Sequence, residues 1–179
     1  MTEKLKYAII GAGCMGQEHI LNIEIIDDAE VVALCDTSEK SIKESLDLLN
    51  NDVAIFDNYI DLVEANIADA FIIATPNFTH IEVLKEVMKS EAHLLIEKPL
   101  CTTVKDCQEF EKLAVDYPGV IWTAMEYRYM PPVQRMIKEI HNKTIGDLKM
   151  LSIREHRFPF LHKVDDWNRF SIKTGGTLV

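Results

Sequence analysis

A glycine-rich loop near the start of the chain contains residue types that bind phosphates. Residues 11–16 follow the pattern G-x-G-x-x-G, in which Gly11 permits a tight turn, Gly13 lets the backbone approach a pyrophosphate and Gly16 lets a helix pack closely on a strand. The start of that helix offers free N–H groups and a partial positive charge to the phosphates. Asp36, twenty residues after Gly16, is placed to accept both hydroxyls of an adenosine ribose. The spacing predicts a dinucleotide site, and the alternative is a turn that merely requires glycine.

A second polar loop, Thr75-Pro76-Asn77, follows an apolar run at residues 70–74. Its ordinary interpretation is the end of a strand and the start of a helix, with Asn77 as the capping residue and His80 one turn later. The other interpretation is a ligand-binding loop, because open parallel sheets bind their ligands at the carboxyl ends of the strands.

A third loop, Glu97-Lys98-Pro99, follows the apolar run at residues 94–96. Its ordinary interpretation is an exposed ion pair between Glu97 and Lys98. A lysine beside a bound nicotinamide would instead stabilise the alkoxide that develops as hydride leaves or joins a carbonyl carbon. Both interpretations remain open at this point.

The elements that would position these loops alternate along the chain. Short apolar runs, mostly β-branched, are typical of strands buried on both faces of a parallel sheet, and they lie at residues 7–10, 31–34, 70–74, 94–96 and 120–123. Between them apolar residues recur with a helical period, as in Ile81, Leu84 and Met88. Cap candidates precede two of the helices, at residues 36–38 and 102–103. The alternation predicts an α/β fold with a doubly wound parallel sheet.

The last third of the chain has a different character. A helix follows Pro131-Pro132, and residues 148–153 have the pattern of one more strand, with loop-like sequence after it. Residues beyond about 125 are too few to bury a stable core alone. We therefore expect a first domain at residues 1–124 and an incomplete second domain at residues 125–179, whose missing part would pair with the strand at 148–153.

Composition excludes several classes of partner. A net charge of −10, from 19 basic and 29 acidic residues, would repel a phosphate backbone and anionic lipid, so neither nucleic acid nor a membrane is expected as a partner. The absence of an apolar run of about 18 residues and of a signal-peptide pattern predicts a cytoplasmic protein. The four cysteines form no C-x-x-C pair and have no histidine at metal-ligand spacing, which predicts reduced core thiols and no metal site; they are Cys14, Cys35, Cys101 and Cys107.

Taken together, these motifs resemble those of the Gfo/Idh/MocA family of NAD(P)-dependent oxidoreductases. The glycine loop, Asp36, the Thr75 loop with His80, and Glu97-Lys98-Pro99 match in order and spacing over residues 5–100. The glutamate-lysine-proline signature is the specific feature. The resemblance implies a Rossmann domain followed by the start of an α+β substrate domain, with a sugar, polyol or similar small-molecule substrate between the two.

The resemblance also implies roles for individual residues. Lys98 is the expected catalytic lysine and is also expected to contact the cofactor. The other expected cofactor contacts are Gly11, Ala12, Gly13, Cys14, Met15, Gly16, Asp36, Thr75, Pro76, Asn77, His80 and Glu97. Weaker candidates for substrate contact are Tyr127, Arg128, His156, Arg157, Trp167 and Arg169, for each of which a solvated or packing role is an equal alternative.

The leading functional hypothesis is an NAD-dependent oxidoreductase acting on a secondary alcohol or ketone. NAD is expected rather than NADP because of Asp36. Since the family's proton-transferring histidine would follow Gly175-Gly176, we expect this form to bind the cofactor without turnover, and the complete chain to form a homo-oligomer. The alternatives are a sugar lyase or glycosidase that oxidises its substrate only transiently, and a dinucleotide-binding sensor without turnover.

Overall fold

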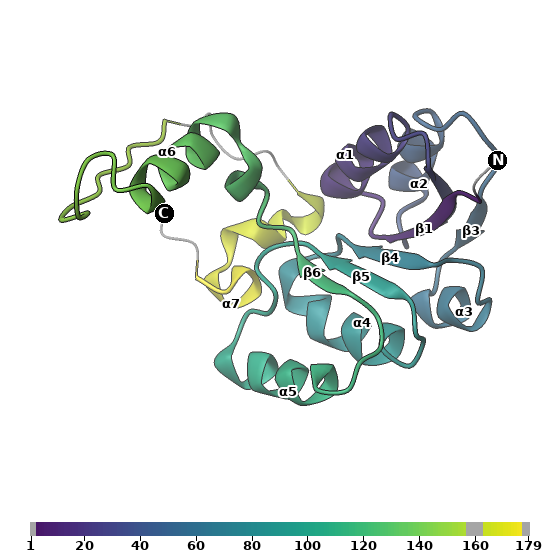
Figure 1. Ribbon diagram of the computed structural model, residues 1–179. Coiled ribbons are helices and arrows are strands. Elements are labelled where there is room, and N and C mark those ends of the chain that lie inside the picture. The colour runs from purple at the N-terminus through teal and green to yellow at the C-terminus, as the bar shows by residue number, and fades with distance from the viewer. Residues whose placement is uncertain (1–2, 157–162, 177–179) are drawn as a thin grey trace. The chain divides into compact units, whose positions relative to one another are not determined.

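A six-stranded parallel sheet forms the centre of the computed structural model, which describes residues 3–156 and 163–176 (Figure 1). The strand order is β3-β2-β1-β4-β5-β6, which is the doubly wound Rossmann order and confirms the predicted fold class. The strands are β1 (Leu5–Ile10), β2 (Ala29–Cys35), β3 (Ala54–Phe56), β4 (Ala70–Ile73), β5 (His93–Ile96) and β6 (Ile121–Thr123).

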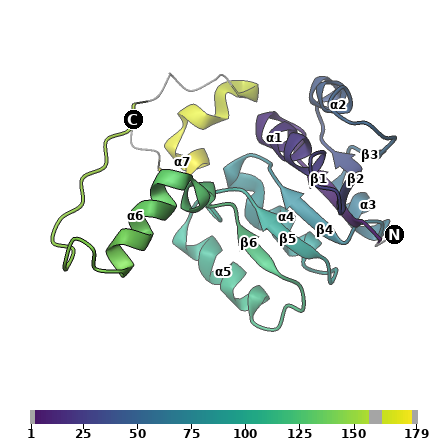
Figure 2. The same cartoon turned by 45° about the horizontal axis from the view of Figure 1, so that its top comes forward.

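Helices connect the strands and cover both faces of the sheet. The connecting helices are α1 (Cys14–Ile23), α2 (Glu39–Leu46), α3 (Tyr59–Glu64), α4 (His80–Val87) and α5 (Val104–Ala114). Two more helices, α6 (Pro131–His141) and α7 (Ser171–Thr174), come after the last strand in the sequence. Three 3₁₀ turns, η1 (Asn77–Thr79), η2 (Glu126–Tyr129) and η3 (Val164–Arg169), lie among the described residues. Figure 2 shows α1 and α2 on one face of the sheet and α3, α4 and α5 on the other.

Two apolar clusters hold the helices to the sheet, one on each face. Successive residues of a strand point to opposite faces, so Ile9 and Ile72 pack with Ile20 of α1 in one cluster. Their neighbours Ala8, Phe71 and Ile73 pack on the other face with side chains of α3, α4 and α5. Burial on both faces explains why the strands appear in the sequence as continuous apolar runs.

The polypeptide divides into two compact units. The first takes in the described residues up to 124 and those from 164 onward, and the second lies within residues 125–163. The whole sheet and α7 belong to the first unit, whereas η2 and α6 belong to the second.

Two helices begin directly after the residues that the sequence predicts as their caps. Ser38 Oγ accepts a hydrogen bond from the Ser41 N–H, and Thr103 Oγ1 accepts one from the Asp106 N–H. These contacts confirm the predicted caps of α2 and α5. Asn58 caps α3 in the same way.

The elements not predicted include β3, α3 and, in the segment expected to be loop-like, η3 and α7, and the prediction of a strand at residues 148–153 is wrong. The edge strand β3 spans three residues and α3 spans six, so neither is long enough to show a clear period. Residues 148–153 form no strand. A strand needs a partner for its backbone hydrogen bonds, and the described part of the second unit contains only η2, α6 and irregular chain.

The prediction of core thiols holds for two of the four cysteines. Cys35 and Cys101 are buried, and burial raises the pKa of each thiol to about 12. Cys14 and Cys107 are exposed, because Cys14 begins α1 at the glycine loop and Cys107 lies on a solvent-facing side of α5. The described residues contain no group of three side chains suited to a metal ion.

No helix in the described ranges has the length and apolar content needed to cross a membrane.

Candidate active site

The three glycines of the loop have different surroundings. Gly11 has a φ of +98°, and a Cβ there would lie 2.6 Å from backbone atoms of Ala74 and Thr75. A Cβ on Gly16 would lie 2.1 Å from the Gly11 carbonyl oxygen. A Cβ on Gly13 would meet nothing within 4 Å. The fold itself therefore requires glycine at positions 11 and 16, whereas the open space at Gly13 leaves room for a ligand to approach the backbone.

The start of α1 has free hydrogen-bonding capacity. Side chains cap the starts of α2, α3 and α5. The N-cap of α1 is Gly13, and α1 has no side-chain capping hydrogen bond. That turn also contains no acidic residue. Uncapped N–H groups and the helix dipole favour an anion at this point.

The peptide groups of Ala12 fix the conformation of the loop. The Ala12 N–H donates to Asp36 Oδ2 at 2.8 Å. The Ala12 carbonyl oxygen accepts hydrogen bonds from Ser45 Oγ at 3.0 Å and from Gln17 Nε2 at 3.2 Å. Ser45 is fully buried on α2. The loop is thus held in place before any ligand binds, which lowers the entropy cost of binding.

Asp36 lies at the end of β2, next to the glycine loop. Besides the Ala12 N–H, its carboxylate accepts the Ser38 N–H at 2.8 Å through Oδ1. A carboxylate offers about four acceptor positions, so both oxygens retain a lone pair for further donors. A cavity of about 340 Å³ adjoins Asp36 and is lined by Thr37, Ile42, Phe56 and neighbouring residues.

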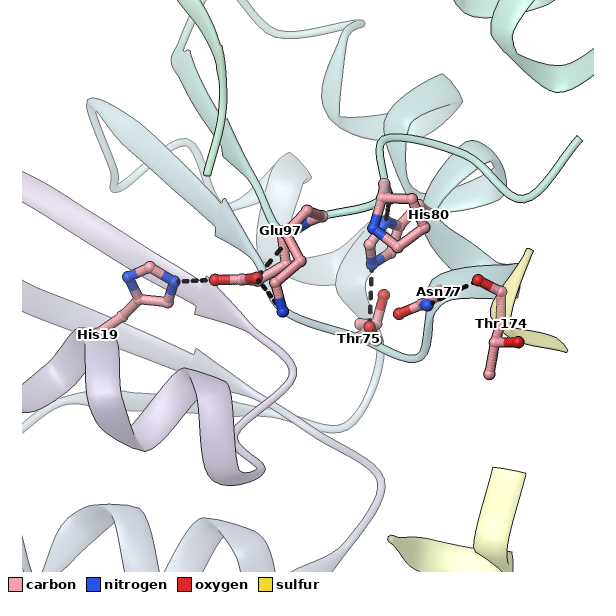
Figure 3. Close-up of polar contacts among 8 residues, drawn as sticks. His19, Thr75, Asn77, His80, Glu97 and Thr174 are labelled. Atoms are coloured by element: carbon pink, nitrogen blue, oxygen red, sulfur yellow. Dashed lines mark hydrogen bonds and ion pairs between the residues drawn. The ribbon is translucent and has the colours of Figure 1, made fainter. Parts of the chain in front are cut away.

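His80 links the second and third loops. Its Nε2 lies 3.0 Å from the Thr75 carbonyl oxygen and its Nδ1 lies 2.9 Å from the Pro99 carbonyl oxygen (Figure 3). A neutral imidazole donates to one of these carbonyls, whereas a protonated ring donates to both. The ring is fully buried, so its position suits support of the two loops from behind.

Asn77 belongs to a contact between η1 and the C-terminal segment of the first unit. Its Nδ2 donates to the Thr174 carbonyl oxygen at 3.1 Å (Figure 3). The next residue, Phe78, packs edge-to-face on Trp167 with the ring centroids 6.4 Å apart. These contacts hold the segment of η3 and α7 against the loop that follows β4.

Glu97 and Lys98 form an ion pair, but the pair is not exposed as the ordinary interpretation expects, because Glu97 is buried. The Glu97 side chain is 7% exposed and the Lys98 side chain is 47% exposed, with Lys98 Nζ 3.9 Å from Glu97 Oε2. Glu97 Oε1 lies 2.9 Å from His19 Nε2 of α1. Sequence reasoning missed His19, whose only signal was its place on the helix that follows the glycine loop.

The pKa of Glu97 reflects opposing effects. Burial alone would raise it, but the hydrogen bond and charge of His19, together with the charge and backbone N–H of Lys98, outweigh burial and hold the pKa below its ordinary value. Glu97 is therefore an ionised carboxylate at neutral pH, with Lys98 as the exposed cation beside it.

The weaker substrate-side candidates fall into both units. In the second unit Tyr127 Oη donates to Glu155 Oε1 at 3.0 Å, and Arg128 and His156 are exposed. In the first unit Trp167 packs on Phe78, and Arg169 Nε lies 3.4 Å from Asp166 Oδ1. Arg157 lies outside the described residues. These contacts do not distinguish any of these residues as a substrate contact.

The residues present fit a dinucleotide. The uncapped start of α1 with the open space at Gly13 suits a pyrophosphate, and Asp36 suits a ribose. Lys98 and Glu97 follow β5, and the Thr75 loop follows β4, at the same carboxyl edge of the sheet. The glycine loop, Asp36 and these two loops therefore lie where a dinucleotide could contact them, and the individual contacts remain predictions.

Comparison with known proteins agrees with this assignment. A family model described as "Oxidoreductase family, NAD-binding Rossmann fold" matches residues 5–125. An inositol 2-dehydrogenase from Pseudarthrobacter chlorophenolicus is 30% identical over 161 residues, which cover 89% of this chain and 47% of that protein. A myo-inositol 2-dehydrogenase from Thermotoga maritima is 26% identical over 149 residues, covering 83% of this chain and 44% of that protein.

A solved structure shows the same architecture with a cofactor present. The WlbA dehydrogenase from Bordetella pertussis, in complex with NADH and UDP-GlcNAcA, is 25% identical and superposes with a TM-score of 0.74 over 80% of this chain and 44% of that one. The chain spans less than half of the length of these relatives. On its sequence motifs, its fold and the family match, the chain belongs to the Gfo/Idh/MocA family of oxidoreductases and contains that family's NAD-binding Rossmann domain.

Proposed function

We propose that the protein transfers a hydride between NAD and a secondary alcohol or ketone of a sugar- or polyol-like substrate. The observation that carries this proposal is Lys98, an exposed cation 3.9 Å from the ionised Glu97 at the carboxyl edge of the sheet. A domain that only binds a dinucleotide has no need of a lysine there. The inositol dehydrogenases among the relatives support the polyol class of substrate.

Each group of residues would have a distinct task. The N–H groups at the start of α1 would bind the pyrophosphate, and Asp36 the adenosine ribose. Glu97 would bind the nicotinamide ribose, and Asn77 with Pro76 would line the nicotinamide half. NAD, when bound, supplies the hydride acceptor. Lys98 would place its ammonium group against the substrate oxygen and stabilise the alkoxide that forms there.

The test of this proposal is a measurement of NADH formation. The full protein is incubated with NAD and a panel of inositols and other polyols, and the absorbance of NADH is followed. We expect NADH to form with at least one of these polyols. Substrate cleavage without net NADH would favour transient oxidation, and NAD binding without any turnover on the panel would favour a sensor. Either result would overturn the proposed net oxidation.

Asp36 gives a prediction about cofactor choice. The protein should bind NADH at least about 10-fold more tightly than NADPH, because a 2′-phosphate would bring a second negative charge against the Asp36 carboxylate and no donor to it. Thr37 and Ser38 are neutral, and Lys40, the nearest cation in sequence, is engaged with Glu44 at 3.7 Å.

Calorimetric titrations with the two cofactors measure this preference. In Asp36→Ala the difference between the affinities for NADH and for NADPH should become smaller. Asp116→Ala, which removes an exposed carboxylate after α5, is the matched control and should leave the preference for NADH unchanged. Equal affinities in the unsubstituted protein would remove Asp36 from the cofactor site.

A further inference from the structure

The contact between His19 and Glu97 joins two parts of the site that are 78 residues apart in the sequence. His19 lies on α1, the helix that begins at the glycine loop, and Glu97 follows β5 in the sequence. Figure 3 shows the two side chains pointing toward each other. Both side chains are largely buried, with 16% of His19 and 7% of Glu97 exposed. An ionised carboxylate can only accept hydrogen bonds, so His19 Nε2 carries the proton in this contact.

The two oxygens of Glu97 have separate partners. Oε1 lies 2.9 Å from His19 Nε2, whereas Oε2 accepts the Lys98 backbone N–H at 3.2 Å and lies 3.9 Å from Lys98 Nζ. With Oε1 held by His19, the carboxylate plane has a fixed orientation, and Oε2 is presented to Lys98. A carboxylate free to rotate would leave the ammonium group without a fixed neighbour.

We propose that His19 is a positioning residue for the catalytic lysine, acting through Glu97 to hold the Lys98 ammonium group where substrate oxygen would lie. The inference rests on the proposed function, because it assigns His19 a part in that same reaction. It differs from a purely structural role, in which the pair would only fasten α1 to the sheet.

The electrostatic consequence can be worked out from the groups that face Glu97. Burial raises the pKa of Glu97, whereas the hydrogen bond and electrostatic effect of His19 from α1, together with Lys98 from the adjoining loop, lower it. Removing His19 leaves burial opposed by Lys98 alone, so the pKa of Glu97 should rise. Glu97 would then be protonated at a higher pH and cease to hold Lys98.

The first test needs neither substrate nor cofactor. Carbon-13 NMR of the Glu97 side-chain carboxyl, followed against pH in the 179-residue protein, should show the pKa of Glu97 rising by at least about one pH unit in His19→Ala. His19→Gln, which retains an N–H donor, should show a smaller rise. His141→Gln, an exposed histidine of the second unit, is the control and should leave Glu97 unchanged. An unchanged Glu97 in His19→Ala would overturn the inference.

The second test uses activity of the full protein. His19→Ala should lower kcat at least about 10-fold, since small displacements of a catalytic group are costly. The acidic limb of its kcat profile should move to higher pH, and kcat should fall by a larger factor than the affinity for NADH, because the pyrophosphate and adenosine contacts remain. His19→Gln should restore most of kcat, and it keeps the inference testable if His19→Ala folds poorly.

The outcomes separate this inference from the proposed function. Unchanged kcat and pH profile in a folded His19→Ala protein would show that the pair is structural, with the proposed reaction intact. Failure of the unsubstituted protein to reduce NAD with any polyol would instead remove the proposed function, while the NMR titration would still report whether His19 controls Glu97.

Discussion

Lys98→Met is expected to lower kcat of the full protein by roughly 10²-fold or more, with NADH affinity nearly unchanged. Lys98 is 47% exposed and its Nζ lies 3.9 Å from the buried Glu97 carboxylate, so its ammonium group is held near the edge of the sheet and is accessible to a substrate oxygen. A preorganised charge aimed at a developing alkoxide contributes about 3–4 kcal/mol to the transition state. Methionine retains most of the length of the side chain and removes the charge.

Steady-state kinetics and an NADH titration of the same preparation measure both parts of this prediction. Lys89→Met is the matched control, because Lys89 is an exposed lysine paired with Glu86 at the end of α4, and it should keep full activity. An unchanged kcat in Lys98→Met would return Lys98 to the role of a surface cation and would remove the feature on which the proposed chemistry depends.

The second large effect is expected at Gly13. Gly13→Ala should weaken NADH binding roughly 10- to 100-fold, the equivalent of losing one charge-assisted hydrogen bond of about 1.5–3 kcal/mol. The added methyl group would occupy the space in front of the backbone that the pyrophosphate approaches. That space is empty in the protein itself, and Gly13 has an ordinary φ of −77°. The melting temperature should therefore stay the same.

Gly16→Ala separates loss of binding from loss of fold. A Cβ there would lie 2.1 Å from the Gly11 carbonyl oxygen, so this variant should lose stability whether or not NADH is present. Thermal melts and calorimetric titrations of both variants give the comparison. Equal NADH affinity in Gly13→Ala and the unsubstituted protein would contradict a pyrophosphate at this loop.

Much of the fold could be predicted because the apolar runs in the sequence coincide with the strands that are buried in the structure. The runs that became β1, β2, β4 and β5 are apolar, as strands covered on both faces must be, whereas β6 lies at the edge of the sheet and is only partly buried. The edge strand β3 is also apolar, but its three residues are too few to predict a strand. Residues 148–153 show the limit of such patterns, because their apolar residues suit a strand but a strand also requires a neighbour to pair with.

The positions of the loops at the edge of the sheet could be predicted, but the contacts between them could not. Glycine spacing and the residue types of the loops were sufficient to locate the parts at the edge of the sheet. The bond from His19 to Glu97 spans 78 residues, and the bond from Asn77 to Thr174 spans 97. Contacts of this range depend on how the chain crosses the sheet, and the identities of the two residues alone do not specify them.

A crystal structure of the protein with NADH tests the central assignment most directly. The account predicts the pyrophosphate within hydrogen-bonding distance of the N–H groups at the start of α1, the adenosine ribose on Asp36 and the nicotinamide ring beside Lys98. A dinucleotide bound elsewhere, or a nicotinamide ring directed away from Lys98, would contradict it.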